Sequence, residues 1–428
     1  MSIKSAFSVI TSAAQSCNGC GKCTPRCEVL TDASHTIGEL AAAYAAAAEG
    51  CDLATEEGVA ACIEKVNALA SAAPMLVFAV RRCCMCAFCT QTCTAGVDAR
   101  SVFAAVREVL SIAGITTQEG FESTQVDTEW HIFSVYRAVY GINYVDLPHV
   151  GGEGGVPAEG AETLFFPGCP LASYAPELTR EIFAWLQAQG MNVALSEACC
   201  GSPLKSAGFG DRAREFKRDI ARVITDAGIR RVVCVCPGCL DELREADGME
   251  NVEFVALPQL LADAGMKMNP AKLRKVMGIA EGADTPLFTL AVCDSCHDRE
   301  GVFGDPLRTL FDETCLRELD HNGADTLCCG AGGAVSLVDP ALCTRRAQRV
   351  LDEGAAHADV VVANCPTCSY TFAAQGRTGM RTAAGEAYAH CNYLDLMFEA
   401  EFDWDMIFSQ LEGMWSGEYG PWVCQQLT

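Results

Sequence analysis

The stretch VVCVCPGC, residues Val232–Cys239, recurs 129 residues later as VVANCPTC, residues Val361–Cys368. In both copies a C-P-x-C motif follows a β-branched run, and such a run predicts a buried strand. The motif Cys-Cys-Gly recurs with the same offset, at residues 199–201 and 328–330. Upstream, LFFPGC ends at Cys169 and LFTLAVCDSCH contains Cys296. We infer that the C-terminal two thirds of the chain is an internal repeat of two lobes.

Segments with helical periodicity separate the predicted strands: Pro176–Gln189, Ala213–Ala227 and Ala341–Gly354. This alternation predicts α/β lobes with mainly parallel strands, whose ligands bind at the carboxyl ends of the strands. Two lobes of one design predict pseudo-twofold packing, with the cysteine sites facing each other. We place the first lobe at residues 163–285 and the second lobe, with a C-terminal extension, at residues 286–428.

Cysteine is unusually abundant, with 27 residues in a chain of 428. The N-terminus lacks the apolar core of a secretory signal, and the longest uncharged apolar stretch, Asn67–Val80, is shorter than the roughly 20 residues that cross a bilayer. We therefore expect a cytoplasmic protein with reduced thiols, in which a cysteine surplus indicates metal binding. The net charge of −24 disfavours binding to nucleic acid or to anionic membranes.

Two N-terminal runs have the spacing C-x2-C-x2-C-x3-C: CNGCGKCTPRC at residues 17–27 and CCMCAFCTQTC at residues 83–93. This spacing is typical of cubane 4Fe–4S binding, and in two-cluster ferredoxins the fourth cysteine serves the other cluster. A zinc knuckle could explain one run, but two in succession favour iron–sulfur. We assign one cluster to Cys17, Cys20, Cys23 and Cys93, and the other to Cys83, Cys86, Cys89 and Cys27.

Residues 1–145 are predicted to form a helical domain around these two cluster sites. The Ala-rich residues 38–73 and the segment Ser101–Ile112 have helical spacing. Together with CTAGVDAR at Cys93–Arg100, they resemble the helical ferredoxin domain of succinate dehydrogenase iron–sulfur subunits. The Gly- and Pro-rich residues 146–162 predict a linker. The predicted fold class is thus an α-helical domain followed by two α/β lobes.

The order Cys, Cys-Cys-Gly, Cys-x2-Cys in each lobe is similar to the tandem cysteine-rich CCG domain of heterodisulfide reductase catalytic subunits. Related iron–sulfur subunits of glycolate, lactate and anaerobic glycerol-3-phosphate oxidising systems share this domain. The whole chain resembles the D-type subunit of heterodisulfide reductase and the glycolate oxidase iron–sulfur subunit. The resemblance implies a noncubane 4Fe–4S cluster in each lobe and ten catalytic, metal-binding cysteines: Cys169, Cys199, Cys200, Cys236, Cys239, Cys296, Cys328, Cys329, Cys365 and Cys368.

Each lobe motif has a simpler alternative. A zinc ion in one lobe, or buried structural cysteines, would also explain the motifs. Nine cysteines stay without an assigned role, and three of them lie within three residues of a proposed ligand: Cys84, Cys234 and Cys293. His297, next to Cys296, is either a proton donor to a departing thiolate or a structural neighbour of the site.

The resemblance implies an electron-transfer and catalytic subunit of an anaerobic oxidoreductase that reduces a disulfide. The alternative is an electron relay that passes electrons from a 2-hydroxy acid or glycerol-3-phosphate dehydrogenase to quinone. The sequence has no flavin or nicotinamide motif. Both functions therefore require a flavoprotein, a ferredoxin-like donor or a membrane cytochrome as partner, and a membrane cytochrome would hold the chain at the inner face of the membrane.

Overall fold

A computed structural model describes residues 3–151, 156–279, 288–377 and 389–427. The chain divides into two compact units. The N-terminal unit comprises residues 1–127, 203–215 and 330–343, and the second unit comprises residues 128–202, 216–329 and 344–428. The two short segments of the N-terminal unit directly follow the two Cys-Cys-Gly motifs, so each lobe sends one segment into the N-terminal unit.

Helices and two cysteine loops build the N-terminal unit. α1 packs on α3 and α6, and its buried apolar side chains, such as Phe7 and Ile10, belong to one core with those of α3 and α6. Three-residue 3-10 helices η1 (Thr24–Arg26) and η2 (Thr90–Thr92) lie in the two cysteine loops, and η3 is Glu122–Thr124. The α-helices are α1 (Ile3–Ser16), α2 (Glu28–Ala33), α3 (Ile37–Ala48), α4 (Glu56–Ala72), α5 (Pro74–Arg82) and α6 (Ala99–Ile112).

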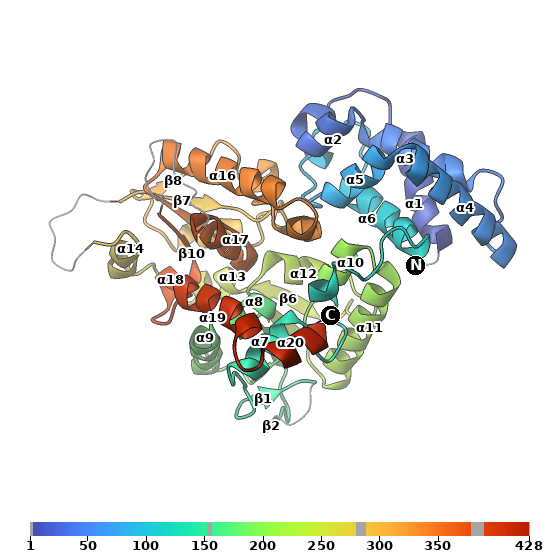
Figure 1. Cartoon of the computed structure of the whole chain (residues 1–428). Coiled ribbons are helices and arrows are strands. Elements are labelled where there is room, and N and C mark those ends of the chain that lie inside the picture. Colours follow the sequence, from blue (N-terminus) through green and yellow to red (C-terminus); the bar gives the residue numbers. More distant parts are fainter. Residues whose placement is uncertain (1–2, 152–155, 280–287, 378–388, 428) are drawn as a thin grey trace. The chain divides into compact units, whose positions relative to one another are not determined.

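Lobe one contains a parallel sheet with the order β2-β1-β4-β3-β5-β6. Figure 1 labels strands β1, β2 and β6 of this sheet. Its strands are β1 (Pro148–His149), β2 (Val156–Pro157), β3 (Thr163–Phe166), β4 (Val193–Leu195), β5 (Arg231–Cys234) and β6 (Glu253–Ala256). Its helices are α7 (Ile132–Val139), α8 (Cys169–Tyr174), α9 (Pro176–Ala188), α10 (Ser202–Ala207), α11 (Gly210–Asp226), α12 (Pro237–Arg244), α13 (Leu257–Asp263) and α14 (Pro270–Val276).

Lobe two contains a parallel sheet with the order β10-β9-β7-β8. Its strands are β7 (Leu290–Cys293), β8 (Leu316–Arg317), β9 (Val360–Ala363) and β10 (Ala389–Asn392). Its helices are α15 (Gly304–Thr309), α16 (Pro340–His357), α17 (Pro366–Arg377), α18 (Leu394–Met397), α19 (Trp404–Ser416) and α20 (Gly420–Leu427), with 3-10 helices η4 (Gly323–Asp325) and η5 (Gly332–Leu337).

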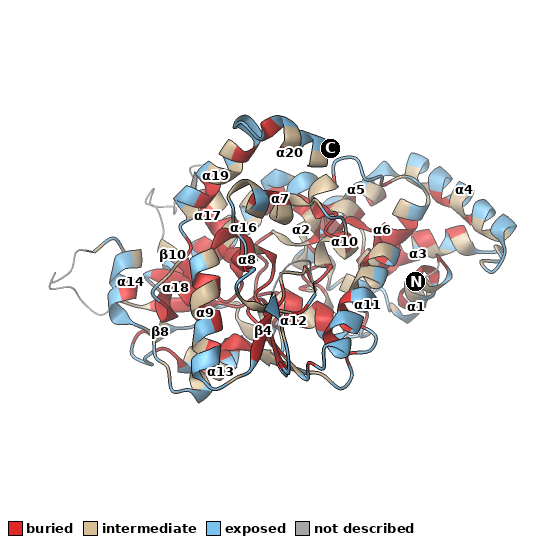
Figure 2. Cartoon of the chain, turned by 90° about the horizontal axis from the view of Figure 1, so that it is seen from below, coloured by how far each residue is buried: buried red, intermediate tan, exposed pale blue. Residues whose placement is uncertain are grey.

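The four strands of lobe two correspond one to one with β3–β6 of lobe one. Across the sheet, these strands lie in the order β4-β3-β5-β6 in lobe one and β8-β7-β9-β10 in lobe two. In both lobes the second strand of the chain is therefore followed by the first, the third and the fourth, and the strand pairs are parallel. The prediction of α/β lobes with parallel strands is confirmed. The central strands β3, β7 and β9 are buried along their whole length, as expected for β-branched and aromatic runs between two layers of helices (Figure 2).

The segment predicted as a linker, residues 146–162, contains two short strands. His149 in β1 pairs with Leu195 of β4, and the backbone N–H of Val150 donates to the carbonyl oxygen of Leu195 at 3.0 Å. Pairing with an open sheet edge satisfies backbone groups that a free linker would leave to water. Composition alone does not reveal such edge pairing.

Within the described residues, no single helix is both long and apolar enough to cross a bilayer. α4 and α5 reach that length and composition only as a pair, and the pair is bent by 94°. Pro74 begins α5 at a position where proline is tolerated, so the bend lies between two separate helices.

Candidate functional site

Two cysteine motifs of each lobe follow a pair of adjacent strands, β3 and β5 in lobe one and β7 and β9 in lobe two. Phe166 of β3 pairs with Cys234 of β5, and Cys293 of β7 pairs with Ala363 of β9. Because the strands are parallel and in register, the loops that follow them leave from the same edge of the sheet. These loops begin the cysteine motifs at Cys169, Cys236, Cys296 and Cys365. The structure therefore places the predicted cysteines at the carboxyl edge of each sheet.

Each C-P-x-C motif begins a helix. Cys236 is the N-cap of α12, whose first residue is Pro237, and α17 begins at Pro366 directly after Cys365. Proline fits the first helical position because its missing N–H has no intrahelical partner there. Both motifs therefore place their first cysteine directly before a helix, at its N-terminus.

Glycines let the remaining cysteine loops turn sharply. Gly201 and Gly330, which complete the two Cys-Cys-Gly motifs, have φ angles of 81° and 91°. Gly168, before Cys169, has φ 76°, and a Cβ atom on it would lie 3.1 Å from Sγ of Cys239. These left-handed conformations are open to glycine at little cost, so the motif glycines are required by the backbone.

Eight of the ten lobe thiols form one continuous chain of side-chain hydrogen bonds. The chain crosses from lobe one to lobe two at the contact between Cys236 and Cys365. The sequence prediction that the two sites face each other agrees with this contact. In order, the connected residues are Cys169, Cys199, Cys200, Cys239, Cys236, Cys365, Cys368 and Cys329.

The hydrogen bonds within this chain favour one thiolate in each lobe. Hydrogen bonds with Cys199 and Cys239 lower the pKa of Cys200 well below its usual value. Hydrogen bonds with Cys236 and Cys368 do the same to the pKa of Cys365. Both cysteines are buried. A buried thiolate needs a compensating charge, which a bound metal supplies.

The unassigned Cys234 and Cys293 end the strands β5 and β7. Burial raises the pKa of each thiol far above its usual value, and the neighbouring Cys200 adds to this for Cys234. Raised pKa values favour neutral thiols, which pack as small apolar residues. Cys234 and Cys293 are therefore core side chains at the strand ends that precede the cysteine loops.

His297 connects the two lobes beside the cysteines. Its Nδ1 lies 2.9 Å from Oδ2 of Asp241 in α12 of lobe one. A Cβ atom placed on Gly238 would lie 3.7 Å from Cδ2 of His297 and 3.8 Å from Sγ of Cys236. His297 therefore belongs to the loop of Cys296 in lobe two but lies over the C-P-G-C motif of lobe one, which its position in the sequence does not reveal.

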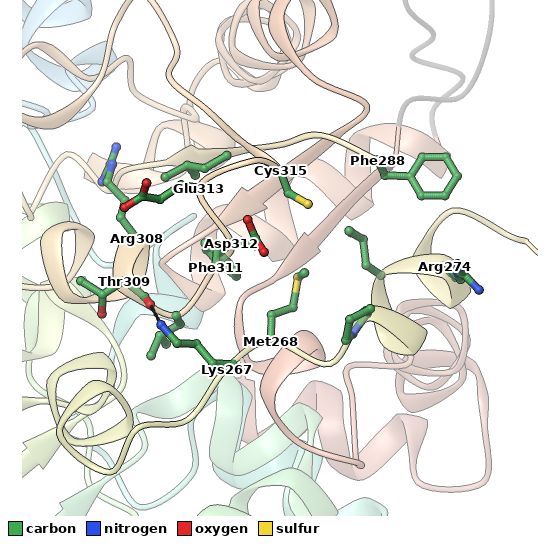
Figure 3. Close-up of a pocket in the computed structure, with 14 residues that line it drawn as sticks. Lys267, Met268, Arg274, Phe288, Arg308, Thr309, Phe311, Asp312, Glu313 and Cys315 are labelled. Atoms are coloured by element: carbon green, nitrogen blue, oxygen red, sulfur yellow. Dashed lines mark hydrogen bonds between the residues drawn. The ribbon is translucent and has the colours of Figure 1, made fainter. Parts of the chain in front are cut away.

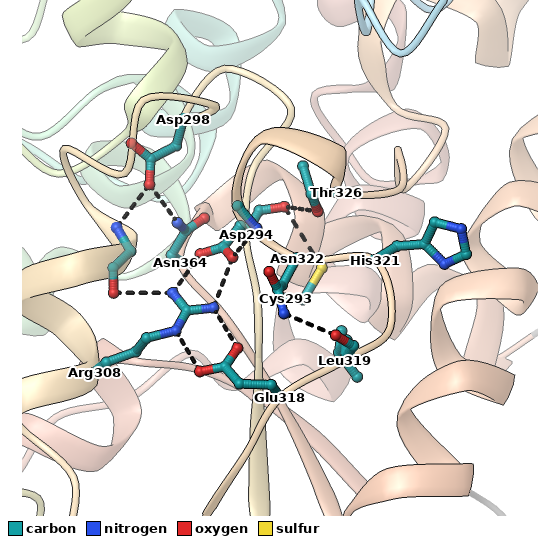
Figure 4. Close-up of polar contacts among 12 residues, drawn as sticks. Cys293, Asp294, Asp298, Arg308, Glu318, Leu319, His321, Asn322, Thr326 and Asn364 are labelled. Atoms are coloured by element: carbon teal, nitrogen blue, oxygen red, sulfur yellow. Dashed lines mark hydrogen bonds and ion pairs between the residues drawn. The ribbon is translucent and has the colours of Figure 1, made fainter. Parts of the chain in front are cut away.

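Buried polar side chains hold the loop that carries Cys296 (Figure 4). Asn364 accepts a hydrogen bond from the backbone N–H of Ser295 at 2.8 Å and donates to Asp298 at 3.1 Å. The carboxylate of Asp294 pairs with Arg308 at 2.8 Å, and burial raises the pKa of Asp298 to about 7. The sequence analysis missed this network, although the acidic residues in CDSCHD were a visible signal.

The two cysteine loops of the N-terminal unit have the same backbone conformation. The residues before and after the middle cysteine have positive φ in both loops: Gly19 and Gly21 around Cys20, and Met85 and Ala87 around Cys86. Each third cysteine is the N-cap of a 3-10 helix and each fourth cysteine its C-cap. The shared spacing therefore produces one shared loop shape, with glycine in one loop and non-glycine residues in the other.

The fourth cysteine of each loop lies near the other loop. After burial, Cys27 is the largest cause of the raised pKa of Cys89. The side chain of Thr94, next to Cys93, is hydrogen-bonded to Cys20. The guanidinium of Arg26 lies 3.8 Å from the ring centroid of Phe88. These neighbours are the ones that an exchange of the fourth ligand between two clusters requires.

The donor sets fit iron–sulfur clusters in chemical type. Each lobe offers five thiols at one sheet edge, and each N-terminal loop offers four, with backbone N–H groups 3.3 Å from Sγ of Cys83 and of Cys93. Hydrogen bonds to ligand sulfurs are a known means of tuning cluster potential. Among the described residues, no group of three or more His, Cys, Asp or Glu side chains surrounds a single ion. Cluster ligands bind different iron atoms and need not converge on one point.

The described residues of the second unit line a larger and a smaller cavity. The larger cavity, of about 850 Å³, is lined by residues such as Lys267, Phe311 and Cys315, which precede β8 in the chain (Figure 3). None of the ten lobe cysteines lines it. The smaller, of about 400 Å³, is lined by residues that include His149, Glu197 and Ala198, the residue before Cys199. The smaller cavity therefore adjoins the predicted site of lobe one.

Comparison with known proteins identifies a domain that each lobe contains. The cysteine-rich domain CCG matches residues 163–244 and 290–373, one copy in each lobe. An iron–sulfur protein of Methanocaldococcus jannaschii is 24% identical over 300 residues, which are 68% of this chain and 56% of the relative. The chain thus spans just over half the length of that relative.

Two further relatives are named as parts of oxidoreductases. The D-type subunit of the dihydromethanophenazine:CoB–CoM heterodisulfide reductase of Methanosarcina barkeri is 26% identical, over 71% of this chain and 74% of the relative. The C-type subunit of the anaerobic glycerol-3-phosphate dehydrogenase of Escherichia coli is 26% identical, over 49% of this chain and 54% of the relative. The chain therefore contains two copies of the cysteine-rich CCG domain and is similar to iron–sulfur proteins and to subunits of oxidoreductases.

Proposed function

We propose that the chain is the iron–sulfur subunit of an anaerobic oxidoreductase in which the lobe cysteines reduce a disulfide. The contact between Cys236 and Cys365 carries this proposal, because it joins the thiols of both lobes into one buried array. A disulfide has two sulfur atoms that must separate, and two facing sites can each receive one of them. The relatives named for heterodisulfide reduction support this function.

The proposed ligand sets follow the arrangement of the thiols. Two cubane clusters would occupy the N-terminal loops, with Cys27 and Cys93 exchanged between them. Two noncubane clusters would occupy the lobes, with zinc in one lobe as the alternative. When bound, the clusters supply single electrons; reduction of one disulfide consumes two electrons and two protons and releases two thiols.

The protein supplies the protons and the protected environment of the site. His297 lies beside Cys236. Its Nδ1 donates a hydrogen bond to the carboxylate of Asp241, which orients the ring and leaves Nε2 for the departing thiolate. We assign to His297 the role of holding a proton for a departing thiolate in lobe one. Burial of Cys236 and Cys365 excludes water from the sulfur chemistry.

The second candidate function is an electron relay. Similarity to the anaerobic glycerol-3-phosphate dehydrogenase of Escherichia coli favours it. In that case a partner flavoprotein would oxidise a 2-hydroxy acid or glycerol 3-phosphate, and the chain would pass electrons toward quinone. In either function the partner would be a flavoprotein, a ferredoxin-like donor or a membrane cytochrome.

Metal analysis of anaerobically purified protein tests the cofactor content. Four clusters predict about 16 irons per chain, an equal amount of acid-labile sulfide and no zinc. About eight irons with one zinc would contradict the two noncubane clusters.

An assay of product stoichiometry tests the reaction. We expect the reduced protein, with a viologen as electron donor, to release two thiols per two electrons from an asymmetric disulfide. The His297→Gln variant should slow thiol release, because glutamine cannot hold the proton that the departing thiolate needs. Electron transfer to a quinone analogue without any release of thiols from disulfides would favour the relay.

A further inference from the structure

We propose that the second cysteine loop, residues 83–93, passes electrons into lobe two before lobe one, and that Cys84 and the segment 330–333 form this connection. The inference rests on the proposed iron–sulfur function. It assigns a role to Cys84, which no cluster assignment uses, and to the glycine run that follows Cys329.

The segment after Cys329 lies directly against the backbone of the cysteine loop. A Cβ atom on Gly332 would lie 2.4 Å from the carbonyl oxygen of Cys84, and one on Gly333 would lie 2.1 Å from that of Cys83. No side chain fits at either position. Gly333 also has φ 65°, which favours glycine for a second reason. The glycines therefore permit contact between two backbones.

A hydrogen bond crosses this contact beside the proposed ligands. Sγ of Cys84 donates to the carbonyl oxygen of Gly330 at 3.6 Å, and both groups are buried. Cys84 is bonded to Cys83, and Gly330 is bonded to Cys329. The path from one proposed ligand to the other thus contains two peptide bonds and one hydrogen bond.

Arg107 keeps the two backbones together. Its buried guanidinium donates to the carbonyl oxygens of Cys83 at 2.6 Å and of Gly333 at 2.7 Å. Arg82 pairs with Asp339, in the same segment, at 2.7 Å. A hydrogen bond from a charged donor to a buried carbonyl is stronger than one between neutral groups. Arg107 therefore stabilises the contact by binding both backbones.

The corresponding segment of lobe one packs against helix α6 instead of against a cysteine loop. A Cβ atom on Gly208 would lie 2.8 Å from the carbonyl oxygen of Arg107 in α6. Arg214 pairs with Glu108 of α6 at 2.7 Å. Arg107 also donates to the carbonyl oxygen of Ser206, which is six residues beyond Cys200. Because electron transfer slows with each added bond, the shorter connection favours lobe two.

Rapid-freeze electron paramagnetic resonance after mixing with a reductant tests this order. The signal of the lobe-two site, identified by its loss in Cys329→Ser, should appear before that of lobe one, identified by Cys200→Ser. Cys84→Ala should delay the lobe-two signal severalfold, whereas Cys84→Ser, which keeps a donor, should restore the order. Cys62→Ala, at another buried cysteine of the same unit, is the matched control and should change neither rate.

A second readout tests the contact without electron transfer. Gly333→Ala should speed alkylation of Cys84, measured by mass spectrometry, because the added Cβ separates the backbones. Gly114→Ala is the matched control, since Gly114 has φ 71° with no atom within 4 Å of a Cβ position.

Three results would overturn the inference: a lobe-one signal that appears first, equal rates in Cys84→Ala and Cys62→Ala, or equal alkylation in the two glycine variants. If the wild-type protein binds about 16 irons and shows both lobe signals, any of these three results refutes the proposed electron order but not the proposed function. Absence of both lobe signals, together with a low iron content, refutes the proposed function as well.

Discussion

Lobe one and lobe two share one strand order, but their cysteine loops are held in place by different chemistry. Before its first cysteine, lobe one has Pro167 and Gly168, whose backbone angles define the turn. Lobe two has Asp294 and Ser295 at these positions and holds the turn through hydrogen bonds to buried polar groups. After the third strand, lobe one has the apolar Val235 where lobe two has Asn364.

This difference teaches that one fold can stabilise the same cysteine geometry by conformational restriction or by a polar network. A restricted backbone is insensitive to pH, whereas a network with buried carboxylates changes its strength when they titrate. It follows that the two lobes should respond differently to mutation and to pH.

The largest expected difference comes from removal of one cysteine per lobe. Cys329→Ser should eliminate the lobe-two cluster signal and about four irons per chain, and Cys200→Ser should do the same for lobe one. Paramagnetic resonance and iron analysis on the two variants measure this. Loss of both signals in either variant would mean that the lobes assemble their clusters together rather than separately.

An exchange of the residues after the third strand should lower stability in both lobes, for different reasons. Asn364→Val leaves the N–H of Ser295 without its partner and removes one of the two donors to Oδ2 of Asp298, at a cost of about 1–3 kcal/mol. Val235→Asn buries an amide in an apolar core, at a cost of about 1–3 kcal/mol. Anaerobic denaturant unfolding followed by circular dichroism measures both. A neutral Asn364→Val would show that the network does not stabilise lobe two.

The buried Asp395 should make lobe two sensitive to pH. It accepts hydrogen bonds from the N–H groups of Asn392 and Phe402, and burial raises its pKa to about 7. The folded chain then holds a proton that the unfolded chain releases near pH 4, so this group contributes stability at low pH that is lost as the pH rises toward 7.

Asp395→Asn mimics the protonated form and should remove this dependence, with a difference on the order of 4 kcal/mol between pH 4 and pH 8. Unfolding free energies of wild type and variant across that range measure the effect. Parallel curves for the two proteins would contradict the raised pKa.

The smallest expected effect concerns the turn before the first cysteine. Gly168→Ala forces a Cβ into a left-handed position 3.1 Å from Sγ of Cys239 and should cost about 1–2 kcal/mol. Ser295→Ala, at the corresponding position of lobe two, removes a side-chain acceptor for the N–H of His297 and should cost less than about 1 kcal/mol. Thermal unfolding of both variants compares them, and an equal effect would argue against the different origins of the two turns.

The sequence predicted the two lobes well because an internal repeat is visible as motifs that recur at a constant offset. The 129-residue offset, the β-branched runs and the helix Pro176–Gln189 correspond to the observed strand order and to α9. The interleaved cysteine ligands stay a prediction, with neighbours in the structure that agree with it. Asn364, Asp298 and Arg107 were not predicted, because a polar residue in a core is recognised only when its partners are known.

By itself the sequence determined the repeat, the parallel α/β lobes and the position of each C-P-x-C motif after a strand, because these follow from local propensity and spacing. Only the tertiary structure decided which cysteines meet across the lobes, that His297 of one lobe lies over the other, and that residues 330–343 pack with the N-terminal unit. These depend on contacts between residues far apart in the chain, which close packing selects and which no local pattern encodes.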